Sequence, residues 1–556
     1  MLGAVSMQSA LGDMAATLAA MERSVSGLRR CDALGMTAGV AGEVLPPPSR
    51  FEDESLTRFE RLAVCHVQEV LRKSGLSLAD DSVRLIISTT KGNVELLSEG
   101  FEPVPRRAFL WASAEAVGSS LHCAVRPVVI SNACISGLSA FVVARDMLLA
   151  GECRHVIVVG CDVLSAFIAE GFASFKSVSA SACRPYDAAR DGLTLGEACG
   201  AALLTVDASV AEKPFVYISG GAVTNDANHI SGPSRTGDGL YYAIREAMSE
   251  AGVSASDAGF VNTHGTATAY NDEMESKAVA WAGLADTPLN ALKGYIGHTL
   301  GASGVVETIL CAEQLRRGYI FGTCGYSACG TSVPLRISAD RQSISGRCCI
   351  KTASGFGGCN AAIVLDLERR RQADTGRQTL REAETVAEYT LPHSSLPFDE
   401  FIRGQFKLLG ESNMKFYKMS DLCKALYVAA GNLLQRAGAD DCQPVRRAVV
   451  LANSSSSIEA DMRHQSIVDE HLPEGASPAA FVYTLPNVAA GELCIRHGFQ
   501  GDNTFFIEER DSGTAERYAR RLIAADRADA VVCGWCDKLG RTWSVNLKLL
   551  KVKQNK

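Results

Sequence analysis

The sequence predicts a layered α/β fold followed by a partial second copy of it, and three observations support this prediction. Short apolar segments alternate with longer segments of helical character over residues 1–366, as in folds that stack strands and helices in layers. Hydrophobic residues make up 47% of the 556 residues and charged residues 21%, which is typical of a chain that buries a large core. Residues 396–556 repeat apolar segments of the first part in the same order.

The strands are predicted from their length and their β-branched residues. Residues 83–88 (VRLIIS), 128–130 and 155–160 (HVIVVG) are the clearest, and a helix is predicted behind residues 131–137, running to Ala150 with a stop at Gly151. Further strands are predicted at residues 201–206, 215–218 and 361–365. A domain is therefore predicted over residues 1–366.

Residues 367–395 form a charged, polar segment that is interpreted as a linker or surface helix. The tail behind it, residues 396–556, is interpreted as a degenerate repeat of the first half of the main domain. Residues 84–90 are echoed by 447–453, residues 135–137 by 511–513, and residues 155–162 by 530–537. Chance similarity between two α/β segments is the alternative. No counterpart of residues 215–366 is found in the tail.

Composition excludes several classes of function. The net charge is −7 without a long basic run, so non-specific nucleic-acid binding is not expected. No apolar stretch reaches about 18 residues, so no membrane span is predicted, and with no basic leader evident a cytoplasmic location is expected. The 19 cysteines are scattered without metal-ligand spacing. Buried reduced thiols are therefore expected, and the Cys533–Cys536 pair is interpreted as structural.

Cys134 is the first candidate for chemistry. It lies between a predicted strand and a predicted helix, so its sulfur is expected at a helix N-terminus, which favours the thiolate. A cysteine that only packs is the alternative.

Two histidines lie in turns rich in glycine and threonine. His264 belongs to the segment 261–268 (VNTHGTAT), and His298 follows Lys293 by five residues in the segment 292–304 (LKGYIGHTLGASG). Either histidine alone could be structural. The Gly-rich segment 353–360 lacks the Gly-Lys-Ser/Thr ending of a phosphate-binding loop, so that reading is rejected.

Taken together, these motifs resemble those of the elongating β-ketoacyl synthases, the condensing enzymes of fatty-acid and polyketide assembly. The nucleophile motif is matched by residues 132–137 (NACISG), the first histidine motif by 264–268, the lysine and second histidine by Lys293 and His298, and the Gly-rich loop by 355–360. The resemblance covers residues 1–366 and implies a thiolase-like layered αβαβα fold with duplicated halves. A histidine at position 298 is the mark of the elongating class, because initiating synthases carry asparagine there and thiolases use a second cysteine.

The resemblance implies a role for each site residue. The catalytic residues are Cys134, His264, His298 and Lys293, with Glu307 supporting the lysine, while Thr266, Thr268 and Phe356 contact the substrate. The backbone N–H groups of Cys134 and Phe356 are the expected oxyanion donors. Ser354 stands where many relatives have a second phenylalanine, so the gating of the acyl pocket is left open.

The implied reaction is the decarboxylative Claisen condensation of an acyl thioester with malonyl-acyl carrier protein. No cofactor and no metal are expected, since the substrates carry phosphopantetheine on the carrier protein. Two alternatives stay open: a malonyl decarboxylase or acyl-transfer variant, and a non-catalytic homologue that docks carrier protein. Acidic carrier protein is the expected partner, with Arg106–Arg107 and Arg369–Arg371 as candidate contacts.

The tail resembles the non-catalytic half-synthase partners that act as chain-length factors in polyketide and aryl-polyene pathways. The family usually dimerises through an edge strand near the nucleophile. A homodimer, or a pseudo-heterodimer with the fused tail, is therefore expected.

Overall fold

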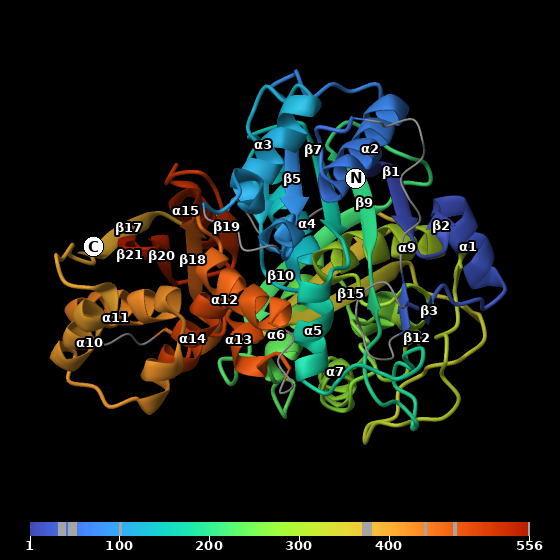
Figure 1. Ribbon diagram of the computed structural model, residues 1–556. Helices are drawn as coiled ribbons and strands as arrows, with labels where there is room; N and C mark the ends of the chain where they lie inside the picture. Colours follow the sequence, from blue (N-terminus) through green and yellow to red (C-terminus); the bar gives the residue numbers. More distant parts are fainter. Residues whose placement is uncertain are drawn as a thin grey trace.

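The computed structural model describes residues 1–31, 40–42, 53–98, 103–369, 381–438, 442–470 and 475–553. Two large sheets run through this part of the chain (Figure 1). The larger one has the strand order β17-β21-β20-β18-β19-β6-β5-β7-β9-β1-β2, and the smaller one has the order β10-β16-β15-β11-β12. The larger sheet thus joins strands of both the main domain and the tail.

The strands of the larger sheet are β1 (Leu2–Ser9), β2 (Gly12–Asp13), β5 (Val83–Ser88), β6 (Val128–Ile130), β7 (His155–Asp162), β9 (Ala198–Thr205), β17 (Ala383–Thr390), β18 (Arg447–Asn453), β19 (Phe505–Ile507), β20 (Ala530–Leu539) and β21 (Thr542–Val552). Those of the smaller sheet are β10 (Tyr217–Asn225), β11 (Ala258–Asn262), β12 (Leu289–Asn290), β15 (Cys348–Gly355) and β16 (Cys359–Asp366). Short strands β3 (Arg29–Arg30), β4 (Val40–Gly42), β8 (Leu195–Gly196), β13 (Tyr319–Ile320) and β14 (Gln342–Ser343) pair separately.

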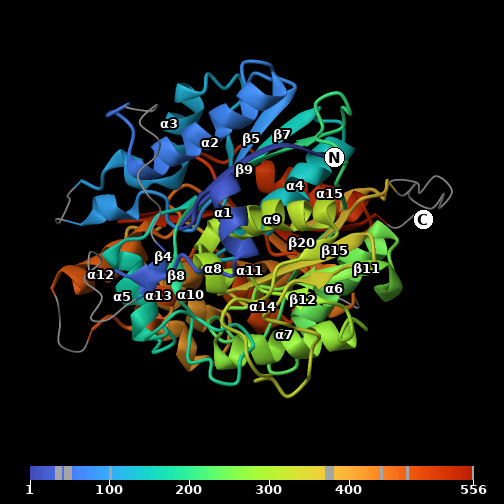
Figure 2. The same ribbon diagram turned by 90° about the vertical axis from the view of Figure 1, so that its right-hand side faces the viewer.

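The helices are α1 (Met14–Glu22), α2 (Arg58–Ser74), α3 (Leu110–Ser120), α4 (Ser136–Leu149), α5 (Ala166–Ser174), α6 (Asp238–Ala251), α7 (Ala269–Trp281), α8 (Lys293–Ile296), α9 (Ser303–Arg317), α10 (Phe398–Leu408), α11 (Asp421–Ala437), α12 (Ile458–Asp469), α13 (Pro478–Val482), α14 (Asn487–His497) and α15 (Thr514–Ala524). Helices α4 and α9 lie between the two sheets, with β5, β7 and β9 on one side and β11 and β15 on the other (Figure 2). Helix α2 covers the outer face of the larger sheet and α6 that of the smaller one. The main domain therefore has the predicted αβαβα layers, and the predicted fold class is confirmed.

The predicted strands are found with small shifts at their ends. Residues 83–88 and 128–130 are β5 and β6 as predicted, and β7 extends the predicted 155–160 by two residues. The predicted strand at 201–206 overlaps β9, which ends at Thr205, and that at 215–218 overlaps the start of β10. The predicted helix behind Cys134 is α4. In the described residues, no helix is long and apolar enough to cross a bilayer.

The segment predicted as a linker, residues 367–395, contains β17 rather than a coil or a surface helix. Strand β17 pairs antiparallel with β21 at the edge of the larger sheet, so the sheet of the tail begins ahead of residue 396. Most of its side chains are exposed, and its polar sequence AETVAEYT is what a protected edge strand carries. Residues 370–380 of this segment, including Arg370 and Arg371, lie outside the described residues.

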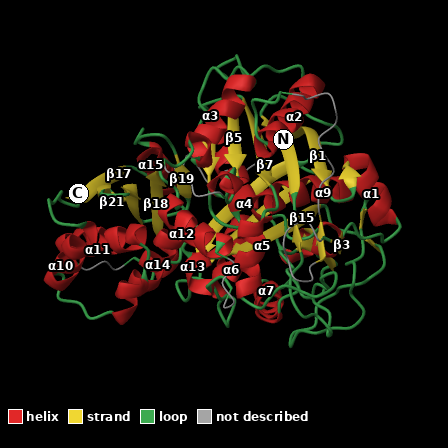
Figure 3. Cartoon of the chain, in the orientation of Figure 1, coloured by secondary structure: helices red, strands yellow, loops and turns green. Residues whose placement is uncertain are grey.

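The tail repeats the first half of the main domain strand by strand. Strand β5 pairs parallel with β6 and β7, and β18 pairs in the same way with β19 and β20. An aspartate at the end of β7 and one in β20 make equivalent bonds: Asp162 accepts from the N–H of Thr90, and Asp537 accepts from the N–H of Ser455 at 2.9 Å. Figure 3 shows the strands of the tail leading from β17 to β19, and β6 separates β19 from β5 in the sheet.

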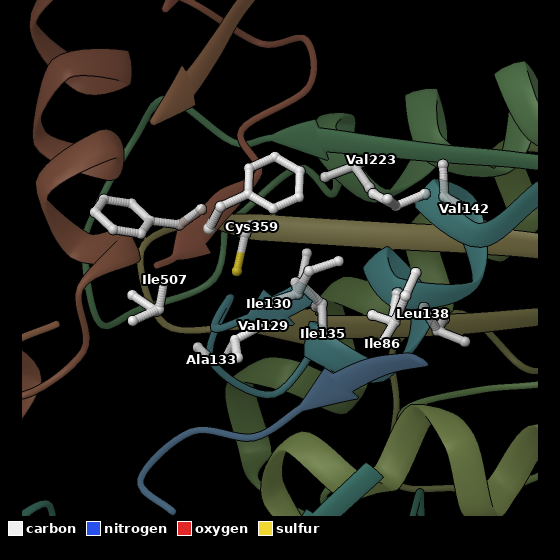
Figure 4. Packing of buried hydrophobic residues seen from close by; sticks show 14 of the residues in the cluster. Ile86, Val129, Ile130, Ala133, Ile135, Leu138, Val142, Val223, Cys359 and Ile507 are labelled. Atoms are coloured by element: carbon white, nitrogen blue, oxygen red, sulfur yellow. The ribbon is translucent and has the colours of Figure 1, made fainter. Parts of the chain in front are cut away.

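The two copies meet where β19 pairs antiparallel with β6, with Ile507 opposite Val129 and Phe506 opposite Ile130. Figure 4 shows Ile507 beside Val129 and Ala133, one residue ahead of Cys134. Ion pairs also cross this boundary: Lys91–Asp461, Arg126–Glu509, Arg521–Glu152 and Arg527–Asp146. The edge of β6 next to the candidate nucleophile is therefore occupied by the chain's own tail.

Candidate active site

Cys134 lies in the buried turn that connects β6 to α4. Ala133 before it has a φ of 48°, which is uncommon for a residue other than glycine. The Ser136 hydroxyl holds this turn, since it accepts from the N–H of Asn132 at 2.8 Å and donates to the carbonyl of Ala133 at 2.6 Å. The strained turn places the sulfur at the start of α4, as the sequence predicts.

A close crossing of α4 and α9 brings the rest of the site to this turn. A Cβ on Gly137 would lie 2.7 Å from the nitrogen of Val305, and a Cβ on Gly304 would lie 2.5 Å from the nitrogen of Leu138. Glycine at both positions allows the helix backbones to touch. Helix α9 carries Glu307, and the loop ahead of it carries His298.

The structure brings Cys134, His264 and His298 together, although they lie far apart in the sequence. Nε2 of His298 is 3.1 Å from Sγ of Cys134. The two imidazole rings stand nearly perpendicular, with their centroids 4.9 Å apart. All three side chains are buried. This arrangement lets one ring exchange a proton with the thiol while both rings face one reacting group.

The second nitrogen of each ring has a polar partner. Nζ of Lys293 lies 3.2 Å from Nδ1 of His264, and because an ammonium can only donate, the ring proton of His264 is on Nε2. Oγ of Ser303 lies 3.2 Å from Nδ1 of His298 and can either donate or accept. His298 can therefore accept the thiol proton at Nε2 in one tautomer and donate from Nε2 in the other.

Lys293 forms a buried ion pair with Glu307 at 2.8 Å, as the resemblance predicts. A second lysine, Lys351 on β15, binds the other oxygen of the same carboxylate at 2.5 Å. Burial alone raises the pKa of Glu307, but the two ammonium groups outweigh it and hold the pKa below its usual value. Glu307 is thus an ionised bridge between two lysines.

The state of the thiol differs from the prediction. Burial raises the pKa of Cys134 to about 12, although Lys293 and the backbone N–H groups of Cys134 and Phe356 act in the opposite direction. The resting thiol is therefore protonated, and the helix N-terminus does not make it a thiolate. Proton transfer to His298 has to accompany its attack on a substrate.

Both histidines are neutral near pH 7. Burial lowers the pKa of His264 and of His298 well below 6.5, and the charges of Lys293 and Lys351 lower it further. A neutral ring with a proton on Nε2 donates a hydrogen bond without carrying charge into the cavity. Such donors stabilise negative charge that develops on a substrate oxygen.

Glu275 on α7 is a residue that the sequence reasoning missed. Its two oxygens accept from the backbone N–H groups of His264 and Gly265, each at 2.7 Å. Asn271 and Tyr186 donate to the same carboxylate at 2.8 and 3.1 Å. Glu275 therefore fixes the loop that carries His264.

The predicted pantetheine contacts, Thr266 and Thr268, lie in the same loop between β11 and α7. Their hydroxyl oxygens are 3.0 Å apart. Their contact with substrate stays a prediction. Arg107, one of the predicted carrier-protein contacts, forms an ion pair with the buried Glu60, while Arg106 pairs with the exposed Glu115.

Phe356 belongs to a cluster of aromatic rings that spans the two copies. Its ring lies 5.9 Å from Phe172 and 5.2 Å from Phe175, and Phe481 of the tail lies 5.2 Å from Phe172. Ser354, in place of a second phenylalanine, donates to Oδ1 of Asn360 at 2.7 Å. The aromatic wall that the sequence lacks at position 354 is supplied by α5 and α13.

A small apolar cavity beside Cys134 is closed by the tail. Its volume of about 20 Å³ has room for about one water molecule. It is lined by Thr90, Lys91, Ala133, Cys134, Ile168, Phe172, Leu300, Phe356, Phe481 and Leu485. Phe481 fits here because Gly171 leaves space: a Cβ on Gly171 would lie 2.2 Å from the Phe481 ring.

The tail also contacts the loop that carries Phe356. Nδ2 of Asn487, at the start of α14, donates to the carbonyl of Phe356 at 2.8 Å. Asn225 donates to the next carbonyl, that of Gly357, also at 2.8 Å. The loop that supplies one backbone N–H to the sulfur is thus held by residues of both the main domain and the tail.

Cys134, His264 and His298 are also residue types that bind zinc, and one ligand atom from each lies within 4.8 Å of the others. The ammonium groups of Lys293 and Lys351 lie behind these rings and repel a cation. The trio is better suited to stabilising negative charge than to holding a metal.

Two families of known proteins match successive parts of the main domain. The family described as Beta-ketoacyl synthase, N-terminal domain, matches residues 42–208, and the one described as Beta-ketoacyl synthase, C-terminal domain, matches residues 215–327. Together they cover about half of the chain. The 3-oxoacyl-(acyl-carrier-protein) synthase 2 of Mycobacterium leprae is 30% identical over 341 residues, which are 55% of this chain and 81% of that protein. The polyketide biosynthesis malonyl-ACP decarboxylase PksF of Bacillus subtilis is 32% identical over 200 residues, 34% of this chain and 48% of that protein.

Solved structures extend the likeness to the tail. The ketosynthase ApeO in complex with its chain length factor ApeC from Xenorhabdus doucetiae is 25% identical, with a TM-score of 0.57, over 66% of this chain and 97% of that chain. The PfaC Keto synthase-Chain length factor matches 99% of this chain and 78% of that chain with a TM-score of 0.77 at 13% identity, which shows a shared fold.

Proposed function

The chain belongs to the β-ketoacyl synthase family, and we propose that Cys134, His264 and His298 perform the decarboxylative condensation of an acyl thioester with malonyl-acyl carrier protein. The observation that supports this most directly is the 3.1 Å contact between Nε2 of His298 and Sγ of Cys134, with His264 facing the same buried space. Acyl carrier protein is the proposed partner, and the proposed location is the cytoplasm.

The first half-reaction transfers the acyl group to Cys134. The thiol gives its proton to His298 as the sulfur attacks the thioester carbonyl. The backbone N–H groups of Cys134 and Phe356, which already face the sulfur, hold the oxyanion. The carbon–sulfur bond to the carrier then breaks, and His298 returns the proton to the departing thiol.

The second half-reaction forms the carbon–carbon bond. The malonyl thioester loses CO₂, and the electron pair moves onto its thioester oxygen. The Nε2–H groups of His264 and His298 stabilise this enolate, and each donor of this kind contributes about 3 kcal/mol. The carbanion attacks the acyl group on Cys134, whose sulfur leaves as a thiolate and takes up a proton from solvent, because the overall condensation consumes one proton. The residues of this chain supply every group that these steps need, so we propose no cofactor.

The tail completes the acyl pocket in this proposal. Phe481 and Leu485 close the cavity beside Cys134, and Asn487 holds the Phe356 loop. The tail thus acts in the manner of a chain-length factor within one chain. Because β19 pairs with β6, we propose an intramolecular pseudo-heterodimer rather than a homodimer through that edge.

Malonyl decarboxylation without condensation is the second candidate function. The cavity beside Cys134 is small for an acyl group, and PksF, described as a malonyl-ACP decarboxylase, is 32% identical over part of the chain. Decarboxylation needs the two imidazole donors but no acyl group on the sulfur.

A single set of variants separates the two functions. Purified full-length protein is given malonyl-carrier and a panel of acyl-carriers, and products are identified by mass spectrometry. Cys134→Ala is expected to lose condensation and retain CO₂ release, His298→Ala to lose both, and Cys533→Ala, a buried cysteine of the tail, to keep both. Condensation by Cys134→Ala, or an acyl adduct on another residue, would overturn the proposal; CO₂ release without any condensed product from the wild type would favour the second function.

A further inference from the structure

A buried lysine, Lys351, lies in the polar cluster behind the two histidines and is not needed to pair Glu307. It is fully buried in the middle of β15, a strand of otherwise small or apolar buried residues. Its Nζ donates to Oε2 of Glu307 at 2.5 Å, to the carbonyl of Thr352 at 2.8 Å and to that of Thr263 at 3.4 Å. Thr263 directly precedes His264, so this ammonium lies against the backbone that carries the ring.

The cluster holds more positive charge than Glu307 can balance. Lys293 and Lys351 share this one carboxylate, each binding a different oxygen. The next acidic group, Glu275, accepts from the N–H groups of His264 and Gly265 and from the hydroxyl of Thr352, but makes no ion pair with either lysine in the described structure. The groups that face this site are therefore two ammonium groups, the bridging Glu307, the backbone-bound Glu275 and the two imidazoles.

A contribution to stability does not by itself explain why a second lysine is buried at this site. Burying an ammonium costs several kcal/mol, and a buried ion pair is often no more stabilising than apolar residues of the same volume. Lys293 already gives Glu307 a partner, so the second ammonium adds a charge rather than completing a pair.

We propose that Lys351 is a positioning residue for condensation: by sharing Glu307 with Lys293 it places a second positive charge behind His264 and His298, so that both rings stay neutral and donate Nε2–H to the enolate. This inference rests on the proposed function, since it assigns a role to the field around the same reaction. The positive charge opposes protonation of either ring and is favourable to the negative charge that decarboxylation moves onto the substrate oxygen.

Lys351→Met, which keeps the length of the side chain but removes its charge, tests this role. Loss of a nearby cation raises the pKa of every group that it faces. The acid limb of the pH profile for malonyl-carrier decarboxylation is therefore expected to move up by at least about half a pH unit, with a rate about tenfold lower at pH 7. Lys351→Arg, which keeps the charge, is expected to restore the wild-type profile.

Lys538→Met is the matched control, because Lys538 is also a buried lysine in a strand and binds Glu459 at 2.7 Å, but in the tail. It is expected to lower the melting temperature without moving the pH profile. If Lys351→Met does not fold, Lys351→Gln replaces it with the same expected shift. A profile of the Lys351 variant that coincides with that of the wild type, measured below the melting temperature of both, would overturn the inference.

A second readout does not depend on condensation. The pH dependence of Cys134 alkylation by iodoacetamide, followed by mass spectrometry, is expected to shift to higher pH in Lys351→Met and to stay in place in Lys538→Met. If no substrate is condensed by the wild type, the proposed function fails, while this alkylation profile still decides whether Lys351 sets the electrostatics of the site. An unshifted alkylation midpoint would count against Lys351.

Discussion

Replacing Phe481 with a smaller side chain is predicted to lengthen the acyl chain that the enzyme accepts. The Phe481 ring lies 5.2 Å from Phe172 and closes a cavity of about 20 Å³ beside Cys134. Phe481→Ala removes the six ring carbons from the end of this cavity. Burying each methylene of a substrate there is worth about 0.8 kcal/mol, so one two-carbon unit is worth about 1.6 kcal/mol. The ratio of longer to shorter product should then rise about 15-fold per two-carbon unit that fits.

The assay is mass spectrometry of carrier-bound products from a mixture of acyl-carriers, with the ratio compared between variants. Phe481→Ala is expected to cost about 3–5 kcal/mol of stability, so Phe481→Leu is measured beside it with a smaller expected shift in the same direction. Phe416→Ala is the matched control, because Phe416 is a buried phenylalanine of the tail that stacks on Phe406 at 4.0 Å instead. Product ratios that are the same in wild type, both Phe481 variants and Phe416→Ala would refute a role of the tail in setting chain length.

Three further predictions follow from other contacts. Asn487→Ala removes the 2.8 Å hydrogen bond to the carbonyl of Phe356, and a buried hydrogen bond of this kind is worth about 1–2 kcal/mol. The acylation rate of Cys134, measured by quenched flow, should therefore fall about tenfold. Asn432→Ala, which removes a hydrogen bond within α11, should leave this rate unchanged. Burial lowers the pKa of His66 to about 4, from 6.5 in the unfolded chain. On acidification, the unfolded chain therefore binds this proton at a higher pH than the folded protein does. Stability is lost as the pH falls from 6.5 to about 4. The free energy of unfolding should therefore drop by about 3 kcal/mol more between pH 6.5 and 4 in the wild type than in His66→Gln, and equal drops in urea titrations would contradict this. Deletion of residues 381–556 frees the edge of β6, and soluble yield should collapse; a soluble, active truncated protein would show that the tail is dispensable.

The sequence predicted best the strands and motifs that periodicity and residue spacing reveal without tertiary contacts. Strands β5, β6 and β7 are continuous apolar runs because both of their faces are covered, so residues 83–88, 128–130 and 155–160 are recognisable without tertiary information. Strand β17 is different. It lies at the edge of the sheet with most side chains exposed, and therefore looks like a polar linker. The echo between the two copies was found because equivalent strands have equivalent neighbours in the sheet.

Within the site, the residues in recognisable motifs were predicted and those placed only by tertiary packing were missed. Lys351 directly follows the apolar run Cys348–Ile350, and a charge at the end of such a run was the available signal. Glu275 reaches the His264 loop from the second turn of α7, which spacing alone does not reveal. The prediction of a thiolate at Cys134 considered the helix N-terminus but not the depth of burial, and burial is the larger effect.

Three parts of the tail reach the site of the main domain. Strand β19 continues the sheet from β6, Phe481 and Leu485 close the cavity, and Asn487 holds the Phe356 loop. In the main domain, the histidines and lysines of the site come from residues 215–366. The two residues of the tail that line the cavity, Phe481 and Leu485, are both apolar. The tail therefore contributes to the shape of the cavity, whereas the groups that exchange protons come from the main domain.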